Sequence, residues 1–355
     1  MARRWATLLV AVGLVAAALG LAAPAQAGTR QLEVATYNIY LGADLAPLAL
    51  AQTPKELVER AGIAYDQVVA TDFPSRARAI SRLLRNERPE VIGLQEVALW
   101  KKGPLGRPLH TTYDFLDILL RELRRAGLHY RAAAVDTTGT ITLPISPTQQ
   151  VSFTNRDAVL VQDGLPVTNA QSHLFAAKLV VTTPFGVTFT FPRGWSAVDV
   201  ALKSKSKGKP ARVRVATTHL QPGPGAPPPV LAIRNAQAQE LHAALAQSPY
   251  PVTALGDFNA LPIEATGPYR TFTNGGYDDA WQTTHGPGDG FTAIQDPDLR
   301  NLPSKLSARI DYVFYQPAHL SADSAHLVGD KVRDRTPTGL WPSDHAGLVV
   351  RLRLH

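Results

Sequence analysis

The stretch Val252-Thr253-Ala254-Leu255-Gly256-Asp257-Phe258-Asn259 has the layout of a buried strand that ends in polar residues. Its first four residues are typical of a strand, and Gly256 permits a tight turn directly after them. Because side chains alternate along an extended chain, Asp257 and Asn259 should lie on the same side. A similar apolar run leads into Glu96. The sequence therefore predicts a rigid sheet that directs polar side chains at one point.

Strand-like runs recur along the chain and are interrupted by amphipathic helical patterns. This pattern of consecutive strands with helices between them predicts a mixed α/β fold with two packed sheets flanked by helices. We find no internal repeat and no clear linker, so we expect one domain over residues 28–355. The lysine-rich segment 203–209 is typical of an exposed hairpin loop. We predict strands at 32–39, 91–97, 158–161, 178–183, 187–191, 213–220, 252–255, 310–315 and 348–352, and helices at 74–86, 112–126 and 231–247.

The first 27 residues have the order of a secretory signal peptide. Arg3 and Arg4 precede an apolar run at 6–23, and Ala25-Gln26-Ala27 supplies a small-x-small cleavage site. Cleavage after Ala27 predicts a secreted protein. The alternative is an uncleaved membrane anchor, because an apolar run of roughly 18 residues is near the lower limit for spanning a bilayer.

Composition narrows the possible sites and partners only slightly. The chain of 355 residues has no cysteine, which excludes disulfides and thiolate metal sites. Its formal net charge is +7, and removal of Arg3 and Arg4 lowers it to +5. A mildly basic exterior favours polyanionic substrates, but weakly. Charge therefore does not decide the substrate.

The polar residues at the predicted strand ends have the chemistry that phosphate-ester hydrolysis needs. A cation offsets charge on the phosphoryl oxygens, and further groups activate water and assist the departing alkoxide. Carboxylates and amides suit a hard cation, and imidazoles suit proton transfer. Each residue alone also has a structural explanation. Asp344 could cap a turn, Asp311 could pair with Arg309, and His219 could be a hydrogen-bonded strand histidine.

Six motifs in one order resemble those of the endonuclease/exonuclease/phosphatase superfamily, which includes deoxyribonuclease I, apurinic endonucleases, sphingomyelinases and inositol polyphosphate 5-phosphatases. The resemblance extends from Leu32 to Leu354 and implies a four-layer α/β/β/α sandwich of two mixed sheets flanked by helices, as in deoxyribonuclease I. It also implies a site at one end of the sheet pair. The motifs are Thr36-Tyr37-Asn38-Ile39, Gln95-Glu96-Val97, Thr218-His219-Leu220, Gly256-Asp257-Phe258-Asn259, Arg309-Ile310-Asp311-Tyr312 and Ser343-Asp344-His345.

The resemblance implies a metal site and a substrate contact. Glu96 would be the principal metal ligand, with Asn38 beside it and Asp344 near the same ion or a second one. The expected ion is Mg²⁺, with Mn²⁺ or Ca²⁺ as alternatives. Asn155, in the segment Asn155-Arg156-Asp157, either positions substrate or belongs to a turn, for which Asn and Asp are favoured.

The resemblance also implies catalytic roles. Asp257 would polarise or deprotonate the attacking water, and Asn259 would hold phosphate or metal. His345 would contact the phosphoryl oxygen or act as acid or base, and Asp311 would orient its ring. A buried carboxylate beside an imidazole fixes the tautomer of the ring and raises its pKa. His219 would assist the leaving group.

These expectations favour a secreted, metal-dependent phosphodiesterase that acts on nucleic acid or phospholipid headgroups. His219 at its motif argues against an apurinic endonuclease. The alternatives are a phosphomonoesterase of the inositol-phosphate type, a membrane-acting toxin and a non-catalytic binding protein on the same scaffold. We expect a monomer with a phosphate-ester substrate and no obligate protein partner.

Overall fold

The computed structural model describes residues 30–202 and 211–355. The signal peptide predicted at 1–27 and the loop predicted at 203–209 lie outside these residues. Within the described ranges, no helix is both long enough and apolar enough to cross a membrane.

Eight strands of the described chain form the first sheet, which is mixed. Strands β1 and β2 are parallel, and the other neighbouring pairs are antiparallel. Strand β5 (Tyr130–Pro144) pairs with β6 alongside the main order. That order is β15 (Leu320–Val328), β16 (Gly347–Leu354), β1 (Arg30–Asn38), β2 (Val91–Gln95), β6 (Gln149–Gln162), β3 (Leu99–Pro104) and β4 (His110–Asp114).

The second sheet has six strands within the described ranges and is also mixed, because β11 and β12 are parallel. A separate two-stranded sheet joins β8 (Leu179–Thr182) to β9 (Thr188–Phe191). The order of the second sheet is β13 (Asp278–Asp279), β14 (Asp311–Tyr315), β12 (Val252–Asp257), β11 (Ala211–His219), β10 (Gly194–Leu202) and β7 (Val167–Leu174).

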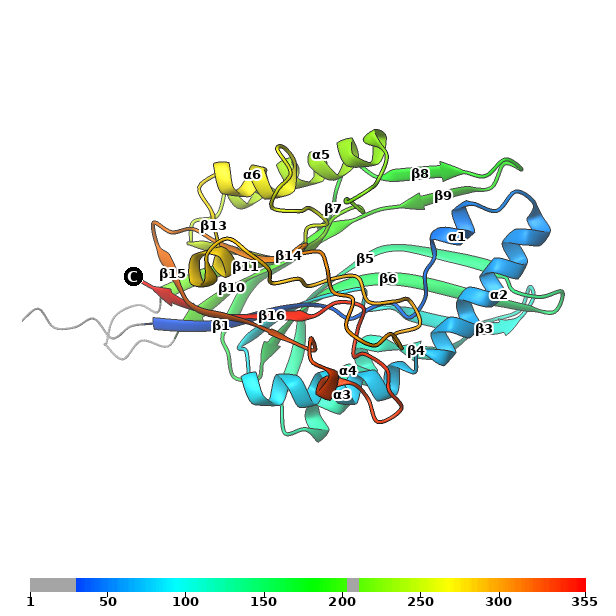
Figure 1. Cartoon of the computed structure of the whole chain (residues 1–355), viewed down its shortest axis with the longest axis horizontal. Helices are drawn as coiled ribbons and strands as arrows, with labels where there is room; N and C mark the ends of the chain where they lie inside the picture. Colours follow the sequence, from blue (N-terminus) through cyan, green and yellow to red (C-terminus); the bar gives the residue numbers. More distant parts are fainter. Residues whose placement is uncertain (1–29, 203–210) are drawn as a thin grey trace, which may run out of the picture.

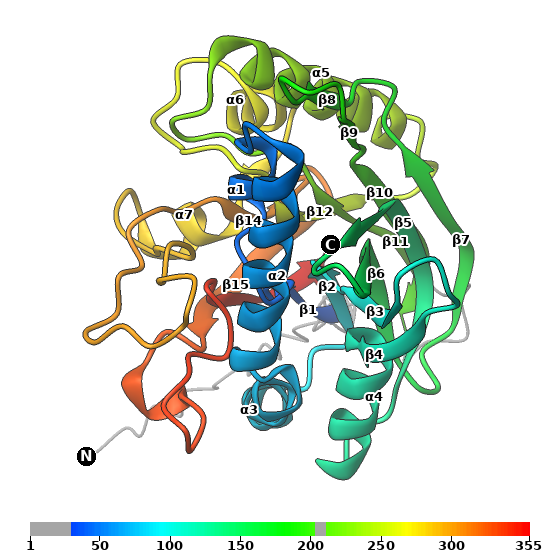
Figure 2. The same cartoon turned by 90° about the vertical axis from the view of Figure 1, so that its right-hand side faces the viewer.

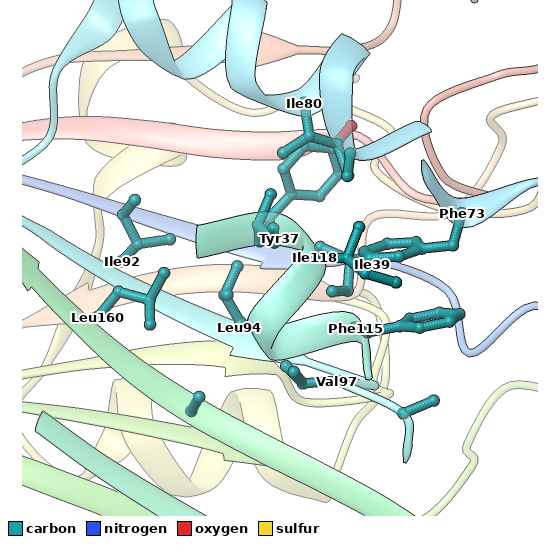
Figure 3. Packing of buried hydrophobic residues seen from close by; sticks show 14 of the residues in the cluster. Tyr37, Ile39, Phe73, Ile80, Ile92, Leu94, Val97, Phe115, Ile118 and Leu160 are labelled. Carbon is teal, nitrogen blue, oxygen red and sulfur yellow. The ribbon is translucent and has the colours of Figure 1, made fainter. Parts of the chain in front are cut away.

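Helices cover the outer face of each sheet, which gives the predicted four layers (Figures 1 and 2). Figure 3 shows side chains of the first sheet packed against α3 and α4, with Phe73 and Phe115 stacked. Three short helices, α1 (Ala46–Ala49), α7 (Ala280–His285) and the 3₁₀ helix η1 (Val332–Asp334), lie in connections. The first sheet is covered by α3 (Phe73–Glu87) and α4 (Phe115–Arg125), and the second by α5 (Pro228–Leu245) and α6 (Pro268–Asn274). Helix α2 (Pro54–Ala70) runs across the strand ends that face the viewer in Figure 2.

The two sheets face each other across an apolar core to which both contribute. Val34 and Val161 of the first sheet belong to the same buried cluster as Val215 and Leu255 of the second. The sheets approach each other closely at Gly93, where a Cβ atom would lie 2.1 Å from Leu255 Cδ1. Only glycine leaves room for this approach, so the spacing of the sheets depends on it.

A predicted helix boundary and a predicted turn differ from the structure. Residues 112–114, expected in a helix, belong to β4, and the helix begins at Phe115 because Asp114 Oδ1 accepts hydrogen bonds from the first-turn amides of Leu116 and Asp117. Gly256 lies inside β12 rather than in a turn, and the backbone of Thr218 fills the space where its Cβ would be. The sequence reading missed α1, α2, α6, α7, η1, β3, β4, β5, β7, β10, β13 and β15.

Candidate active site

Strand register brings the predicted site residues to one end of the sheet pair. In the second sheet His219, Asp257 and Asp311 lie opposite one another across β11, β12 and β14. In the first sheet Asn38 ends β1, and its Nδ2 donates to Asp257 Oδ2 at 3.2 Å. β1 runs from left to right in Figure 1, so this end of the sheets faces the viewer in Figure 2. The strand ends of both sheets therefore meet at one point.

Asp257 is the centre of this arrangement and is buried. Its Oδ2 lies 3.4 Å from His219 Nε2 and 3.9 Å from His345 Nε2. Its Oδ1 accepts a hydrogen bond from the backbone N–H of Asn259 at 2.9 Å. Burial, together with the nearby charge of Asp311, raises the pKa of Asp257 to about 7. A carboxyl with a pKa in this range can both accept and release a proton near neutral pH.

His345 contacts Asp311, the residue expected to orient its ring. Its Nδ1 lies 2.8 Å from Asp311 Oδ2, and the backbone N–H of Asp311 donates to Thr292 Oγ1. Burial alone would lower the pKa of His345, but the carboxylates of Asp311 and Asp344 outweigh it and raise the pKa well above its usual value. These carboxylates favour the imidazolium form of His345, whose Nε2 lies 3.9 Å from Asp257 Oδ2.

The far nitrogen of His219 faces a cation, Arg193, where that of His345 faces a carboxylate. Arg193 Nη1 lies 2.9 Å from His219 Nδ1. A guanidinium can only donate, so Nδ1 must be the unprotonated acceptor and Nε2 carries the hydrogen. Burial, Arg193 and His345 all lower the pKa of His219 well below its usual value. Arg193 was not predicted, because in the sequence it is only a charged residue between two strands.

Two buried carboxyl groups lie behind His219. Asp157 Oδ1 accepts the backbone N–H of Glu96 at 3.0 Å and lies 3.9 Å from His219 Nδ1. The backbone N–H of Asp157 in turn donates to Asp136 Oδ1 at 3.1 Å. Burial raises the pKa of Asp136 to about 7 and that of Asp157 well above its usual range. Asp136 was not predicted, since nothing in its local sequence distinguishes it.

Asn155 lies in a strand, so the alternative that it belongs to a turn is wrong. It is part of β6, where it pairs with Gly139 of β5. Its Nδ2 donates to Thr138 Oγ1 at 2.8 Å, whereas its buried Oδ1 has no hydrogen-bond partner among the described residues. The side chain is therefore fixed at one end, and its carbonyl oxygen is left without a partner.

The predicted metal ligands include two carboxylates that suit a hard divalent cation. Glu96 Oε2 accepts the backbone N–H of Leu41 at 2.8 Å, and Asp344 Oδ1 accepts Ser343 Oγ at 3.3 Å. Within the described ranges, the second oxygen of each carboxylate has no hydrogen-bond partner. Burial raises the pKa of Asp344 to about 6, with Glu96 raising it further and His345 opposing it. A cation between these like charges would stabilise both.

Two predicted residues use their amides to fix the backbone. Asn38 Oδ1 accepts the backbone N–H of Tyr40 at 3.0 Å, and its Nδ2 donates to Asp257 Oδ2. Asn38 therefore orients the Asp257 carboxylate. Asn259 has a left-handed backbone with φ of 51°, and its Nδ2 donates to Leu220 O at 3.0 Å. Asn259 therefore lies beside Asp257, but through a bend rather than by strand alternation.

Three carboxylate and imidazole atoms of Asp257, Asp311 and His345 lie within 4.8 Å of one another, close enough to hold a metal ion. The 2.8 Å contact between Asp311 and His345 already uses one ligand atom of each. The carboxylates of Glu96 and Asp344 keep free oxygens. These two carboxylates, each with an oxygen left over and with like charges that raise the pKa of Asp344, therefore suit a divalent cation.

Comparisons with known proteins agree with this fold. The chain resembles a solved endonuclease/exonuclease/phosphatase family protein from Bacteroides thetaiotaomicron, with a TM-score of 0.58 and 16% identity over 92% of this chain and 99% of that one. A similar protein from Beutenbergia cavernae DSM 12333 has a TM-score of 0.54 and 22% identity over 92% and 72%. A mannosyl-6-phosphatase from Bacteroides thetaiotaomicron VPI-5482 has a TM-score of 0.53 and 16% identity over 90% and 99%.

These likenesses concern the fold, because the identities are low. A search of curated proteins found no match. The sequence model of one family, described as the Endonuclease/Exonuclease/phosphatase family, matches residues 35–345, which span all six motifs. The chain therefore belongs to the endonuclease/exonuclease/phosphatase family, whose members hydrolyse phosphate esters.

Proposed function

We propose that this protein is a divalent-metal-dependent phosphodiesterase. The observation that carries the proposal is one buried carboxyl, Asp257, between a cationic and a neutral imidazole. Such a group can take a proton from water while a cation faces the phosphoryl oxygens. This combination suits in-line attack of water on a phosphate ester.

In this proposal the carboxylates and the two histidines have separate roles. Glu96 and Asp344 would hold the cation, which when bound offsets charge on a phosphoryl oxygen. Asp257 accepts the proton of the attacking water. His345, kept cationic by Asp311, donates to a phosphoryl oxygen. His219 carries its hydrogen on Nε2 and assists the leaving alkoxide.

The proposal is tested by hydrolysis of a chromogenic phosphodiester with Mg²⁺, Mn²⁺ or Ca²⁺. We expect His345→Ala and Asp257→Asn to lower kcat by a factor on the order of 10² to 10⁴, and EDTA to abolish activity. His326→Ala is a matched control, because His326 pairs with Glu87 in a solvent-accessible contact outside the site. Activity that survives EDTA, or that His345→Ala leaves unchanged, would contradict the mechanism.

We propose nucleic acid or phospholipid headgroups as the substrates. The assay therefore includes plasmid DNA, sphingomyelin vesicles, soluble inositol phosphates and a chromogenic monoester. Nicking of DNA without headgroup release selects nucleic acid, and the reverse selects lipid. Faster hydrolysis of the monoesters than of any diester would replace the proposal with a phosphomonoesterase.

We also propose that the protein acts outside the cell as a monomer. The support for export is the order of charged, apolar and small residues before Gly28. Protein recovered from the culture medium should begin at Gly28 and elute at the mass of one chain. An intact amino terminus in the membrane fraction would show that the segment is an anchor.

A further inference from the structure

Arg76 is a fully buried arginine at the start of α3, and its guanidinium contacts only backbone carbonyls by hydrogen bonds. Nε donates to Thr71 O at 2.8 Å. Nη1 donates to Ile39 O at 2.7 Å and to Pro342 O at 3.0 Å, and Nη2 donates to Tyr40 O at 3.1 Å. One side chain therefore joins three separate segments of the chain.

A buried cation without a paired carboxylate is costly. Within the described ranges, no carboxylate forms a salt bridge with Arg76, and its guanidinium carbon lies 4.9 Å from the ring centroid of Phe73. Phe73 stacks on Phe115 in the apolar cluster of Figure 3. Burial lowers the pKa of Arg76 to about 10, which still leaves it charged at neutral pH. An apolar residue would fill this place at less cost if packing were the only requirement.

The segments that Arg76 joins carry the groups assigned to the metal site. Ile39 and Tyr40 directly follow Asn38, and Pro342 precedes Asp344 by two residues. A second link joins the same two segments, because Ser343 Oγ donates to Asn38 O at 2.7 Å. The segment after Asn38 also reaches Glu96, through the backbone N–H of Leu41. The positions of Glu96 and Asp344 relative to each other thus depend on this junction.

We propose that Arg76 is a positioning residue for the metal site, which it assembles by holding the segment after Asn38 against the segment before Asp344. This inference rests on the proposed metal-dependent function. Arg76 touches neither substrate nor metal in this role.

A purely structural role would predict a different outcome from a positioning role. Arg214 provides the matched control, since it is another buried arginine and makes two hydrogen bonds to Asp199 inside the second sheet. Replacing either arginine by lysine should lower the stability of the protein. Only the change at Arg76 should alter how the protein responds to metal.

The experiment measures the rise in Tm on titration with Mn²⁺ or Mg²⁺ for the wild type, Arg76→Lys and Arg214→Lys. Loss of a residue that supports metal ligands typically weakens metal binding by about 10-fold to 100-fold. We expect Arg76→Lys to raise the metal concentration that gives half of the Tm shift by at least about 10-fold, and Arg214→Lys to leave it unchanged. The metal concentration for half-maximal hydrolysis should move in parallel.

Ser343→Ala provides a second test that does not depend on the folding of Arg76→Lys. It removes the other link between the same two segments, together with the 3.3 Å contact of Ser343 Oγ with Asp344 Oδ1, without changing charge, so it should also raise the half-saturating metal concentration. A folded Arg76→Lys protein, or a Ser343→Ala protein, with wild-type metal response would overturn the inference while leaving the proposed function intact. A wild type with neither a metal-dependent Tm shift nor hydrolysis would overturn the proposed function.

Discussion

Asp257 lies between two histidines whose pKa values are shifted in opposite directions because their far nitrogens have different partners. His345 Nδ1 faces the carboxylate of Asp311, whereas His219 Nδ1 faces the guanidinium of Arg193. The two rings are otherwise alike in burial and in their contact with Asp257. The roles of the histidines are therefore set by residues that need not touch the substrate.

Replacement of Arg193 tests this explanation. Arg193→Met removes the donor to His219 Nδ1 and one of the positive charges that lower the pKa of His219. The pKa of His219 should rise, although burial will keep it below its usual value, and kcat should fall by at least about 10-fold. NMR titration of the histidines measures the first effect. Arg212→Met, which changes a half-buried arginine bonded to Thr168 Oγ1, is the control, and an unchanged His219 titration in Arg193→Met would contradict the assignment.

Asp136 supplies a prediction for stability as a function of pH. Its folded-state pKa of about 7 exceeds that of an unfolded aspartate, so the folded state binds the extra proton and stability falls as pH rises towards 7. Asp136→Asn should reduce this fall by about 1–3 kcal/mol between about pH 5 and about pH 8. Urea unfolding at both pH values measures it.

The control for this prediction is Asp199→Asn. Asp199 accepts two hydrogen bonds from Arg214 at 2.7 and 3.0 Å, so its loss should destabilise the protein at both pH values. If Asp136→Asn instead destabilised the protein equally at both pH values, Asp136 would be ionised in the folded state.

At the scale of elements, the separation of the sheets depends on a residue without a side chain. A Cβ atom at Gly93 would lie 2.1 Å from Leu255 Cδ1 and 2.5 Å from Thr217 Oγ1. Gly93→Ala should lower the free energy of unfolding by about 1–3 kcal/mol through overpacking. Urea unfolding checks this. The same substitution should cost less in a Leu255→Val background, and equal costs in both backgrounds would exclude a clash with Leu255.

Local patterns within single elements decide which site residues and strands could be predicted from the sequence. Strand ends such as Asp257 and Glu96 were found because an apolar run that stops at an acid is visible locally. Arg193 and Asp136 were missed because their partners, His219 and Asp157, lie 26 and 21 residues away along the chain. Strand β5 was missed because its exposed and buried residues do not alternate regularly. Local patterns thus predict where a site lies, but not what surrounds it.

At the scale of the whole molecule, the core and the site are separate. The apolar cluster lies between the sheets, whereas His219 and Asp257 end β11 and β12 and Asp311 begins β14. Removal of metal by EDTA should therefore abolish hydrolysis while the far-UV circular dichroism stays unchanged. Restored metal should raise Tm by a few degrees, because it binds only the folded state. Unfolding in EDTA would instead indicate that the cation is structural.

The alignment of His219, Asp257 and Asp311 across three neighbouring strands also limits how this protein can vary. A single residue inserted into β11, β12 or β14 would turn the following side chains to the opposite face of the sheet and separate these groups. Insertions in the connecting loops would leave the alignment intact. The loops around the strand ends are therefore where new substrate preferences can be introduced without rebuilding the acid–base groups.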